Sequence, residues 1–164
     1  MPGAGKSTVG IILAKNLGYG FIDTDVLIQI NHQKTLQQII NESDHLKLRA
    51  IEEQEILKLN IDNHIIATGG SAVYSEKTMN HLLEISKVIF IEIFYEVSLN
   101  RIRNFDTRGI AKAKGQSFKE LFRERQLLYK QYAELTVDGN SANQEELAEQ
   151  ITELVGQQMS FHSQ

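Results

Sequence analysis

The sequence predicts an α/β protein of one domain, in which helices cover both faces of a parallel sheet. Short apolar stretches alternate with longer stretches of helical periodicity along the chain, a pattern typical of parallel sheets. The length of 164 residues suits a single domain spanning residues 1–164, and no linker or repeat divides it. The chain also opens with glycines followed by lysine and serine, an order typical of a loop that binds phosphate groups.

Composition excludes several classes of protein. The apolar fraction of 41% and the charged fraction of 23% are ordinary for a globular protein. The sequence has no cysteine, which excludes disulfides and thiolate metal sites and is typical of a cytoplasmic protein. No apolar stretch reaches the roughly 18–20 residues of a membrane span. Because a net charge of −4 argues against nucleic-acid binding, we expect a cytoplasmic monomer without nucleic-acid or membrane partners.

Helices are predicted from apolar residues spaced three or four apart and from residues that cap helix starts. Ser75 and Ser117 are such caps, and Glu76 lies where the positive end of a helix dipole favours an acid. The predicted helices span residues 6–17, 35–43, 45–59, 75–85, 96–104, 117–133 and 144–157.

Short apolar stretches between these helices predict the strands, and the clearest of them is KVIFIEIF at residues 87–94. The other predicted strands are residues 21–23, 61–68 and 135–138. Residues 105–116 are polar and basic and contain glycine, which predicts a mobile lid. Residues 159–164 are predicted to be a frayed tail.

The first ten residues, MPGAGKSTVG, predict a phosphate-binding loop that leads into a helix. Gly3 and Gly5 allow backbone N–H groups to turn inward around phosphate oxygens, where a Cβ atom would clash. Lys6 places a positive charge against the β- and γ-phosphates, and the Ser7 hydroxyl is suited to bind Mg²⁺. The positive end of the following helix points at the same anion. The expected nucleotide-binding residues of this loop are Gly3, Ala4, Gly5, Lys6, Ser7 and Thr8.

The complete motif has a further glycine five positions before Gly5 and a buried strand before that glycine. Neither lies within this sequence, which begins at Met1. We interpret Met1 as an internal residue of a longer reading frame, because a methionine before Pro-Gly-Ala-Gly suits a loop. The alternative is a degenerate nucleotide-binding domain without transfer activity, since a lost strand removes several side chains that each contribute ~1.5–3 kcal/mol by burial.

Asp23, Thr24 and Asp25 follow a predicted strand at its carboxyl end, where open α/β sheets bind ligands. A phosphotransferase needs one carboxylate to hold Mg²⁺, directly or through water, and uses another to orient or deprotonate the acceptor hydroxyl. We favour these roles because a phosphate loop precedes the motif. The alternative is a helix cap and a turn aspartate, with Asp25 as the cap.

Arg49 and Glu52 are three residues apart on one face of a predicted helix. One interpretation is an ordinary surface ion pair, which contributes little. The other is an arginine that binds a substrate carboxylate or phosphate and is steadied by Glu52. Gly69 and Gly70 end a predicted strand, and they either form a plain turn or let the backbone approach a ligand closely.

Positive charge is concentrated in residues 101–130, where nine lysines and arginines oppose three acids. This segment is either a solvated basic face or a set of arginines that converge on a phosphate-rich ligand, and the phosphate loop favours the second interpretation. Arg101, Arg108 and Arg125 flank the predicted lid. An arginine that closes over the phosphates would neutralise charge in the transition state.

These motifs occur in the order GAGKSTVG, FIDTD, LRAIEEQ, ATGGS, TRG, RERQLLY and TVD. In this combination they resemble shikimate kinase, a family of small P-loop enzymes similar to nucleoside monophosphate kinases, from residue 1 to about residue 140. The resemblance implies ATP-dependent phosphorylation of a ring hydroxyl of shikimate, in aromatic amino-acid biosynthesis, with Mg²⁺ as cofactor. It also implies a three-layer fold with a five-stranded parallel sheet in the order 2-3-1-4-5, whose first strand is absent here, and a lid.

The resemblance implies a role for each residue of the phosphate-donor half. Lys6 matches the lysine that binds the phosphates and assists the transfer. Ser7 matches the Mg²⁺ ligand, and Asp23 matches the carboxylate that reaches Mg²⁺ through water. Arg108 matches the catalytic, nucleotide-binding arginine of the lid, and Arg101 is similar to the arginine that packs on adenine.

The acceptor half is matched in the same way. Asp25 matches the aspartate at the shikimate hydroxyls and is the candidate catalytic base. Arg49 and Arg125 match the arginines that bind the shikimate carboxylate. Gly69 and Gly70 match the glycine loop beside that carboxylate.

The sequence departs from the family pattern near the acceptor. Ser71 stands where the family has a third glycine, and it adds a hydroxyl next to the substrate. Gly109, Ile110 and Ala111 replace Pro-Leu-Leu after the lid arginine, which predicts a looser lid. A second expected function is therefore phosphorylation of another carboxylated polyol, such as a sugar acid.

Overall fold

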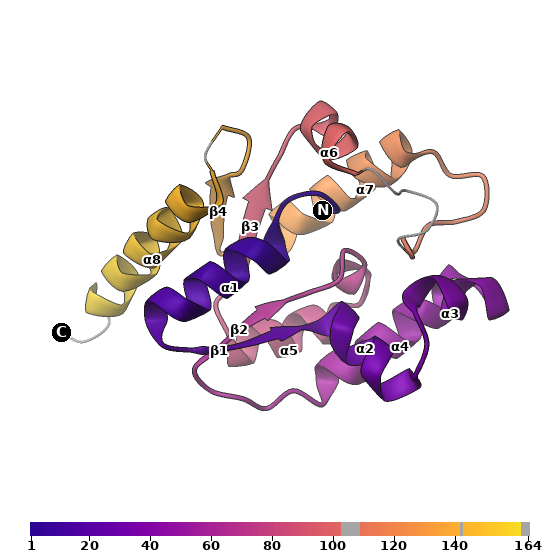
Figure 1. Cartoon of the computed structure of the whole chain (residues 1–164), viewed down its shortest axis with the longest axis horizontal. Helices are drawn as coiled ribbons and strands as arrows, with labels where there is room; N and C mark the ends of the chain where they lie inside the picture. The colour runs from indigo at the N-terminus through magenta and orange to yellow at the C-terminus, as the bar shows by residue number, and fades with distance from the viewer. Residues whose placement is uncertain (103–108, 142, 162–164) are drawn as a thin grey trace.

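The structure is a computed structural model, and it describes residues 1–102, 109–141 and 143–161. Its strands are short and lie in parallel pairs (Figure 1). β1 (Gly20–Asp23) pairs with β2 (His64–Ala67), and β3 (Ile89–Glu92) pairs with β4 (Leu135–Asp138). Parallel strands flanked by helices confirm the predicted α/β class.

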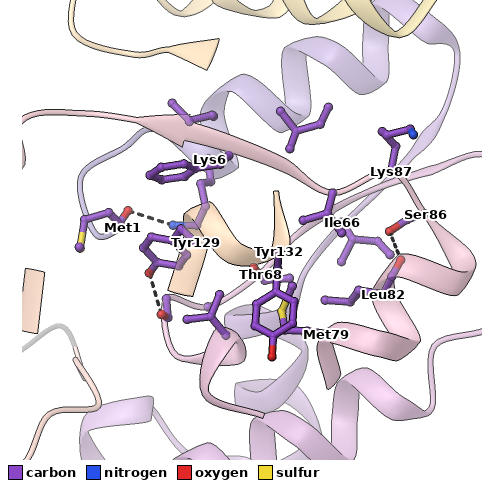
Figure 2. A pocket seen from close by; sticks show the side chains of 17 residues that line it. Met1, Lys6, Ile66, Thr68, Met79, Leu82, Ser86, Lys87, Tyr129 and Tyr132 are labelled. Atoms are coloured by element: carbon purple, nitrogen blue, oxygen red, sulfur yellow. Dashed lines mark hydrogen bonds between the residues drawn. The ribbon is translucent and has the colours of Figure 1, made fainter. Parts of the chain in front are cut away.

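The described strands form two separate two-stranded sheets. A cavity of about 490 Å³ lies between them, lined by Ile65 and Ile66 of β2 and by Ile89 and Ile91 of β3. Figure 2 shows a second cavity of about 110 Å³ that is lined by residues of the same two strands and by Tyr129. β2 and β3 are shorter than their predicted spans, and among the described residues each of them pairs with a strand on one side.

The helices largely begin where the capping residues predict. A helix begins at Thr24, for which the sequence analysis predicted no span. The last helix reaches Phe161, although it was expected to end at residue 157. The helical elements are α1 (Lys6–Leu17), α2 (Thr24–His32), α3 (Leu36–Glu42), α4 (His45–Leu57), the short 3₁₀ helix η1 (Ala72–Tyr74), α5 (Glu76–Ile85), α6 (Tyr95–Arg101), α7 (Phe118–Tyr132) and α8 (Gln144–Phe161). Residues 103–108 of the predicted helix end and lid, and residues 162–164 of the predicted tail, lie outside the described residues.

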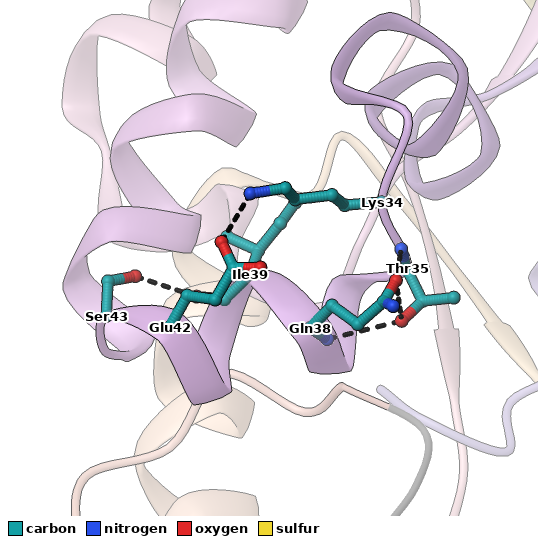
Figure 3. Close-up of polar contacts among 6 residues, drawn as sticks. All are labelled: Lys34, Thr35, Gln38, Ile39, Glu42 and Ser43. Atoms are coloured by element: carbon teal, nitrogen blue, oxygen red, sulfur yellow. Dashed lines mark hydrogen bonds and ion pairs between the residues drawn. The ribbon is translucent and has the colours of Figure 1, made fainter.

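α3 shows how local polar contacts position a short helix (Figure 3). The Thr35 hydroxyl accepts a hydrogen bond from the Gln38 N–H at 3.2 Å, and the Gln38 side chain accepts from the Thr35 N–H at 2.8 Å, which forms a capping box. Lys34 pairs with Glu42 across the helix. These contacts hold Leu36, the first residue of α3, in the wall of a pocket that Lys6 and Arg125 also line.

α1 runs between the two strand pairs in Figure 1 and packs against α8, β1 and β2. Its buried residues Val9 and Leu13 join Ile93, Leu121 and Ala148 in the largest apolar cluster. This cluster fixes the start of α1, and with it the glycine-rich loop. Among the described helices, none combines the length and the apolar character that crossing a membrane requires.

A second, smaller cluster builds the other side of the site. It contains buried side chains of α2, α3, α4 and the segment before α7, namely Ile28, Leu36, Ile39, Leu48, Ile51 and Ala111. The candidate site therefore lies between two separately packed groups of helices, and contacts across it depend on the relative placement of both.

Replacing Ser117 by alanine is expected to lower the free energy of unfolding by ~0.5–2 kcal/mol. The Ser117 hydroxyl accepts from the Glu120 N–H at 3.2 Å, and the Glu120 carboxylate accepts from the Ser117 N–H at 2.8 Å. The substitution therefore leaves the Glu120 N–H without its cap. Chemical denaturation measures the change. Lys119→Ala, an exposed substitution in the same turn, is the control; equal stability of the two variants would contradict the expectation.

Candidate active site

The glycine-rich loop enters α1 through two residues in the left-handed region. Gly3 has φ 77° and Gly5, the N-cap residue, has φ 86°, conformations that glycine adopts without strain. A Cβ atom at Gly3 would lie 3.1 Å from the Ser98 carbonyl oxygen, so the close approach to α6 also requires glycine. Ala4 is buried, and Thr8 is exposed in the first turn of α1. Because Gly5 has no side chain that could cap the helix, the N–H groups of the first turn suit an anion.

Lys6, the first residue of α1, extends back over this loop. Its Nζ atom donates a hydrogen bond to the Met1 carbonyl oxygen at 3.1 Å (Figure 2). The Ser98 hydroxyl donates to the Pro2 carbonyl oxygen at 2.8 Å and ties the loop to α6. The lysine ammonium therefore lies above the loop whose glycines would surround phosphate groups.

Ser7 and Asp23 are in direct contact, although 16 residues separate them in the sequence. The Ser7 hydroxyl donates to Asp23 Oδ2 at 2.5 Å. Asp23 Oδ1 accepts from the N–H groups of Asp25 at 3.0 Å and Val26 at 3.3 Å, so Asp23 is the N-cap residue of α2. The alternative in which Asp25 caps a helix is therefore wrong, because Asp25 lies inside the first turn of α2.

Thr24 connects this motif to the glycine pair. Its side chain is completely buried, and its hydroxyl accepts a hydrogen bond from the Gly69 N–H at 2.9 Å. The sequence analysis assigned Thr24 no role, because a threonine between two aspartates gives no sign of a partner 45 residues away. The contact sets the distance between α2 and the end of β2.

Gly69 and Gly70 lie where side chains from other elements converge. A Cβ atom at Gly69 would overlap Glu52 Oε1 and lie 2.5 Å from Asp25 Oδ1. A Cβ atom at Gly70 would lie 2.6 Å from Arg125 Nη1. Both glycines are thus required by the close approach of functional side chains, which favours the ligand-site interpretation over a plain turn.

Replacing Gly70 by alanine is expected to lower kcat/KM for the acceptor up to about 10²-fold, because the new methyl group displaces the Arg125 guanidinium. The clash is with the end of a flexible side chain, so the fold should persist. Steady-state kinetics measure the fall in kcat/KM, and thermal unfolding checks that the fold persists. Gly156→Ala is the control, since a Cβ atom there would meet nothing within 4 Å; matching kinetics of both variants would refute the displacement.

Arg49 and Arg125 approach the same aromatic ring from α4 and α7. The guanidinium carbon of Arg49 lies 3.5 Å from the centre of the Tyr74 ring, and that of Arg125 lies 5.5 Å from it. Arg125 is only 2% exposed, and its Nη2 donates to the Ala111 carbonyl oxygen at 2.7 Å. Burial lowers the pKa of Arg49 from its usual value, and Arg125 lowers it further. Tyr74, which the sequence analysis did not single out, holds the arginines by cation–π contact.

Glu52 does not form the predicted surface ion pair with Arg49 among the described residues. Its side chain is buried, and its Oε2 accepts a hydrogen bond from the Ser71 hydroxyl. Burial raises the pKa of Glu52 to about 7, and Asp25 raises it as well, whereas Ser71 lowers it. Glu52 acts on Arg49 through the field of its charge, which raises the pKa of Arg49, while the Arg49 guanidinium stacks on Tyr74.

Tyr129 supports the glycine pair, while the remaining predicted arginines lie further away. The Tyr129 hydroxyl donates to the Gly70 carbonyl oxygen at 2.7 Å, and burial raises its pKa to about 12. Arg101 Nη1 donates to the Gly139 carbonyl oxygen at 3.2 Å, next to the end of β4. Arg108 lies outside the described residues.

One pocket joins the phosphate loop to the acceptor side. Its polar lining comes from Lys6, Asp25, Glu52, Ser71 and Arg125. Its apolar lining comes from Ile28, Leu36, Leu48, Ile110 and Ala111. The structure thus brings together residues that the sequence placed in five separate motifs.

A glycine-rich loop at a helix start, a lysine above it and a shared pocket with a carboxylate and an arginine define a phosphotransferase of the P-loop class. Residues 2–156 match the family model described as shikimate kinase. The shikimate kinase of Rhodococcus jostii is 36% identical over 146 residues, which cover 85% of this chain and 86% of that protein. The chain belongs to the shikimate kinase family, whose members transfer a phosphoryl group to an alcohol.

Solved structures agree with this assignment. The shikimate kinase from Acinetobacter baumannii in complex with shikimate superposes with a TM-score of 0.88 at 27% identity, over 96% of this chain and 90% of that one. The shikimate kinase from Aquifex aeolicus superposes with a TM-score of 0.78 at 30% identity, over 91% of this chain and 88% of that one. The fold of the described residues is therefore the α/β fold of this family.

Proposed function

We propose that this chain transfers the γ-phosphoryl group of MgATP to a ring hydroxyl of shikimate. The observation that carries the proposal is the shared pocket, which Lys6 lines from the phosphate loop and Asp25 and Arg125 line from α2 and α7. Phosphoryl transfer requires donor and acceptor to be held close together. A pocket with a phosphate-binding cation, a carboxylate and a carboxylate-binding arginine meets this requirement.

In the donor half, the N–H groups of residues 3–8 bind the phosphates of ATP, and Lys6 neutralises charge that develops during the transfer. The left-handed glycines and the uncapped start of α1 support this assignment. We assign the adenine contact to Arg101, whose guanidinium is held beside Gly139. Arg108 remains the proposed lid arginine.

Ser7 and Asp23 fit a Mg²⁺ ion. The ion prefers oxygen ligands and is usually held by one or two protein groups together with waters and substrate phosphates. A hydroxyl and a carboxylate 2.5 Å apart offer such a donor set at the edge of the phosphate loop. When bound, Mg²⁺ supplies charge neutralisation at the phosphates.

In the acceptor half, Asp25 orients the reacting hydroxyl and accepts its proton. Its position supports this role, because Asp25 lines the pocket and its Oδ1 lies 2.5 Å from the place where a Cβ atom on Gly69 would stand. Arg49 and Arg125 bind the carboxylate of the acceptor. Gly69 and Gly70 have no side chains, so this carboxylate can approach their backbone closely.

A second candidate acceptor is another carboxylated polyol. The observation that favours it is Ser71, which lines the acceptor side of the pocket and whose hydroxyl donates a hydrogen bond to Glu52. A panel of sugar acids, compared with shikimate at equal concentration, distinguishes the two acceptors. Faster turnover of a panel member than of shikimate would favour the alternative.

We also propose the sheet order 2-3-1-4-5 of the family for the complete domain. The pairing of β1 with β2 and of β3 with β4 supports this order, since these would be strands 2 and 3 and strands 4 and 5. The apolar cavity between β2 and β3 has the lining that a central strand would contact.

The direct test is a coupled assay of ADP release from MgATP with and without shikimate. We expect shikimate to stimulate turnover, and phosphorus NMR to detect a new phosphate monoester. ADP release that does not depend on shikimate would contradict the proposal. MgATP binding without any transfer would favour the degenerate nucleotide-binding domain.

A further inference from the structure

The segment 109–111 lines the shared pocket, and hydrogen bonds to two other elements hold its ends. At one end, Arg125 Nη2 on α7 donates to the Ala111 carbonyl oxygen at 2.7 Å. At the other end, the Gly109 N–H donates to Gln37 Oε1 on α3 at 3.1 Å. The proposed reaction uses Arg125 and leaves Gln37 without a role.

The contact with Gln37 depends on a glycine at position 109. Gly109 has φ 68°, in the left-handed region, whereas the ring of a proline fixes φ at about −65°. A Cβ atom at Gly109 would lie 2.5 Å from Leu36 Cβ and 2.9 Å from the backbone nitrogen of Gln37, so the segment lies directly against α3. Proline, which the family pattern has at this position, also lacks the N–H that donates to Gln37. The contact therefore belongs to this chain's own sequence.

Asn41 fixes the orientation of the Gln37 side chain. It lies one turn further along α3, and its Oδ1 accepts a hydrogen bond from Gln37 Nε2 at 2.8 Å. With the amide nitrogen turned toward Asn41, the amide oxygen faces the Gly109 N–H. The acceptor for Gly109 is thus oriented by its own helix, which Thr35 caps (Figure 3).

Packing around the middle of the segment is incomplete. Ile110 borders both the shared pocket and a second cavity of about 350 Å³, which Gln37 also lines. Side chains that border a cavity lack contact partners there. Gly109 itself is buried, and a buried N–H without an acceptor costs free energy. Without an acceptor at Gln37, the segment would therefore shift until the Gly109 N–H reached water.

We propose that Gln37 is a positioning residue for acceptor binding. It holds Gly109, and through the segment 109–111 it fixes the Ala111 carbonyl oxygen that orients Arg125. This inference rests on the proposed function, in which Arg125 binds the acceptor carboxylate. Gln37 is not among the described residues that line the shared pocket, so it acts on the acceptor only through this segment. ATP binding should not depend on it.

The first test replaces Gln37 by methionine, which has nearly the same length but no oxygen to accept the hydrogen bond. We expect Kd and KM for shikimate to rise about 3- to 10-fold, which corresponds to one lost hydrogen bond, while kcat and KM for ATP change little. Gln37→Glu, which keeps an oxygen acceptor at the same position, should restore most of the affinity. Gln54→Met, the same substitution at an exposed position of α4, is the matched control. Calorimetry measures Kd, and thermal unfolding checks that each variant is folded.

A double-mutant cycle and hydrogen exchange test the connection itself. Gly109→Pro removes the N–H that donates to Gln37, so adding Gln37→Met to this variant should cause no further loss of shikimate affinity. Exchange of the Gly109 amide hydrogen, followed by NMR without substrates, should be faster in Gln37→Met than in Gln54→Met, because the hydrogen bond that protects it is lost.

The results separate this inference from the proposed function. Unchanged shikimate affinity in Gln37→Met, fully additive losses in the cycle, or equal exchange rates of the Gly109 amide would overturn the inference while the proposed function stands. A matching increase of KM for ATP would overturn it too, because a general loss of structure affects both substrates. If the unmodified chain binds no shikimate, the proposed function fails first, whatever the exchange rate of Gly109.

Discussion

Lys6→Ala is expected to lower the turnover number by about 10³-fold or more, which is the largest effect of any single substitution considered for this chain. Lys6 is the lysine of the phosphate loop, and its ammonium group lies above the glycines at the start of α1. During the transfer, charge develops on the phosphoryl oxygens, and a fixed cation in a water-poor pocket stabilises that charge more than solvent does. The loss should therefore appear mainly in kcat.

Lys15→Ala is the matched control for this prediction. Lys15 is an exposed lysine in the last turn of the same helix, so its removal changes the net charge equally without touching the loop. We expect wild-type kinetics for the control, and thermal unfolding of both variants checks that α1 is intact. If Lys6→Ala keeps a turnover number close to that of Lys15→Ala, the phosphate loop does not act as proposed.

Arg125→Ala is expected to raise KM for shikimate by about 10²-fold or more while KM for ATP changes little. A charge-assisted hydrogen bond contributes about 1.5–3 kcal/mol, and the guanidinium can form two of them with one carboxylate. The guanidinium is almost fully buried and is already oriented by the Ala111 carbonyl oxygen and by the Tyr74 ring. Arg125→Lys should recover little affinity, because an ammonium group cannot reproduce the planar, two-point contact.

The same substitution should also lower the free energy of unfolding, since the hydrogen bond to Ala111 is lost and a buried side chain is truncated. Unfolding must therefore be measured beside the kinetics, at temperatures where the variant is folded. Arg123→Ala, an exposed arginine on α7, is the control and should alter neither constant. An equal rise of KM for ATP and for shikimate in Arg125→Ala would show a general loss of structure instead of a lost acceptor contact.

Features formed by neighbours in the chain could be predicted from the sequence. The phosphate loop is one example, because Gly3, Gly5, Lys6 and Ser7 lie within five residues and act through their own backbone. The capping box at Ser117 is another, since its two hydrogen bonds join residues only three apart. Such features depend on local backbone preference and on hydrogen bonds to adjacent residues, so a short motif contains the whole cause. The family resemblance rests on motifs of this kind.

Contacts between distant residues could not be predicted in the same way. Arg49 and Glu52 are three residues apart on α4, yet one stacks on Tyr74 and the other is buried against Ser71. The helix positions both side chains, but the elements packed against it determine their partners. Thr24 binding to Gly69 is a similar case, because the contact exists only when β1 and β2 lie side by side.

The sequence by itself therefore determined the α/β class, the family and most of the polar residues that line the pocket. The tertiary structure alone decided how these residues are oriented: Asp23 as the cap of α2, the arginines on the Tyr74 ring, and Glu52 buried against Ser71. The physical reason is that residue type and spacing establish which groups are available, whereas burial and packing across the pocket establish which of those groups meet.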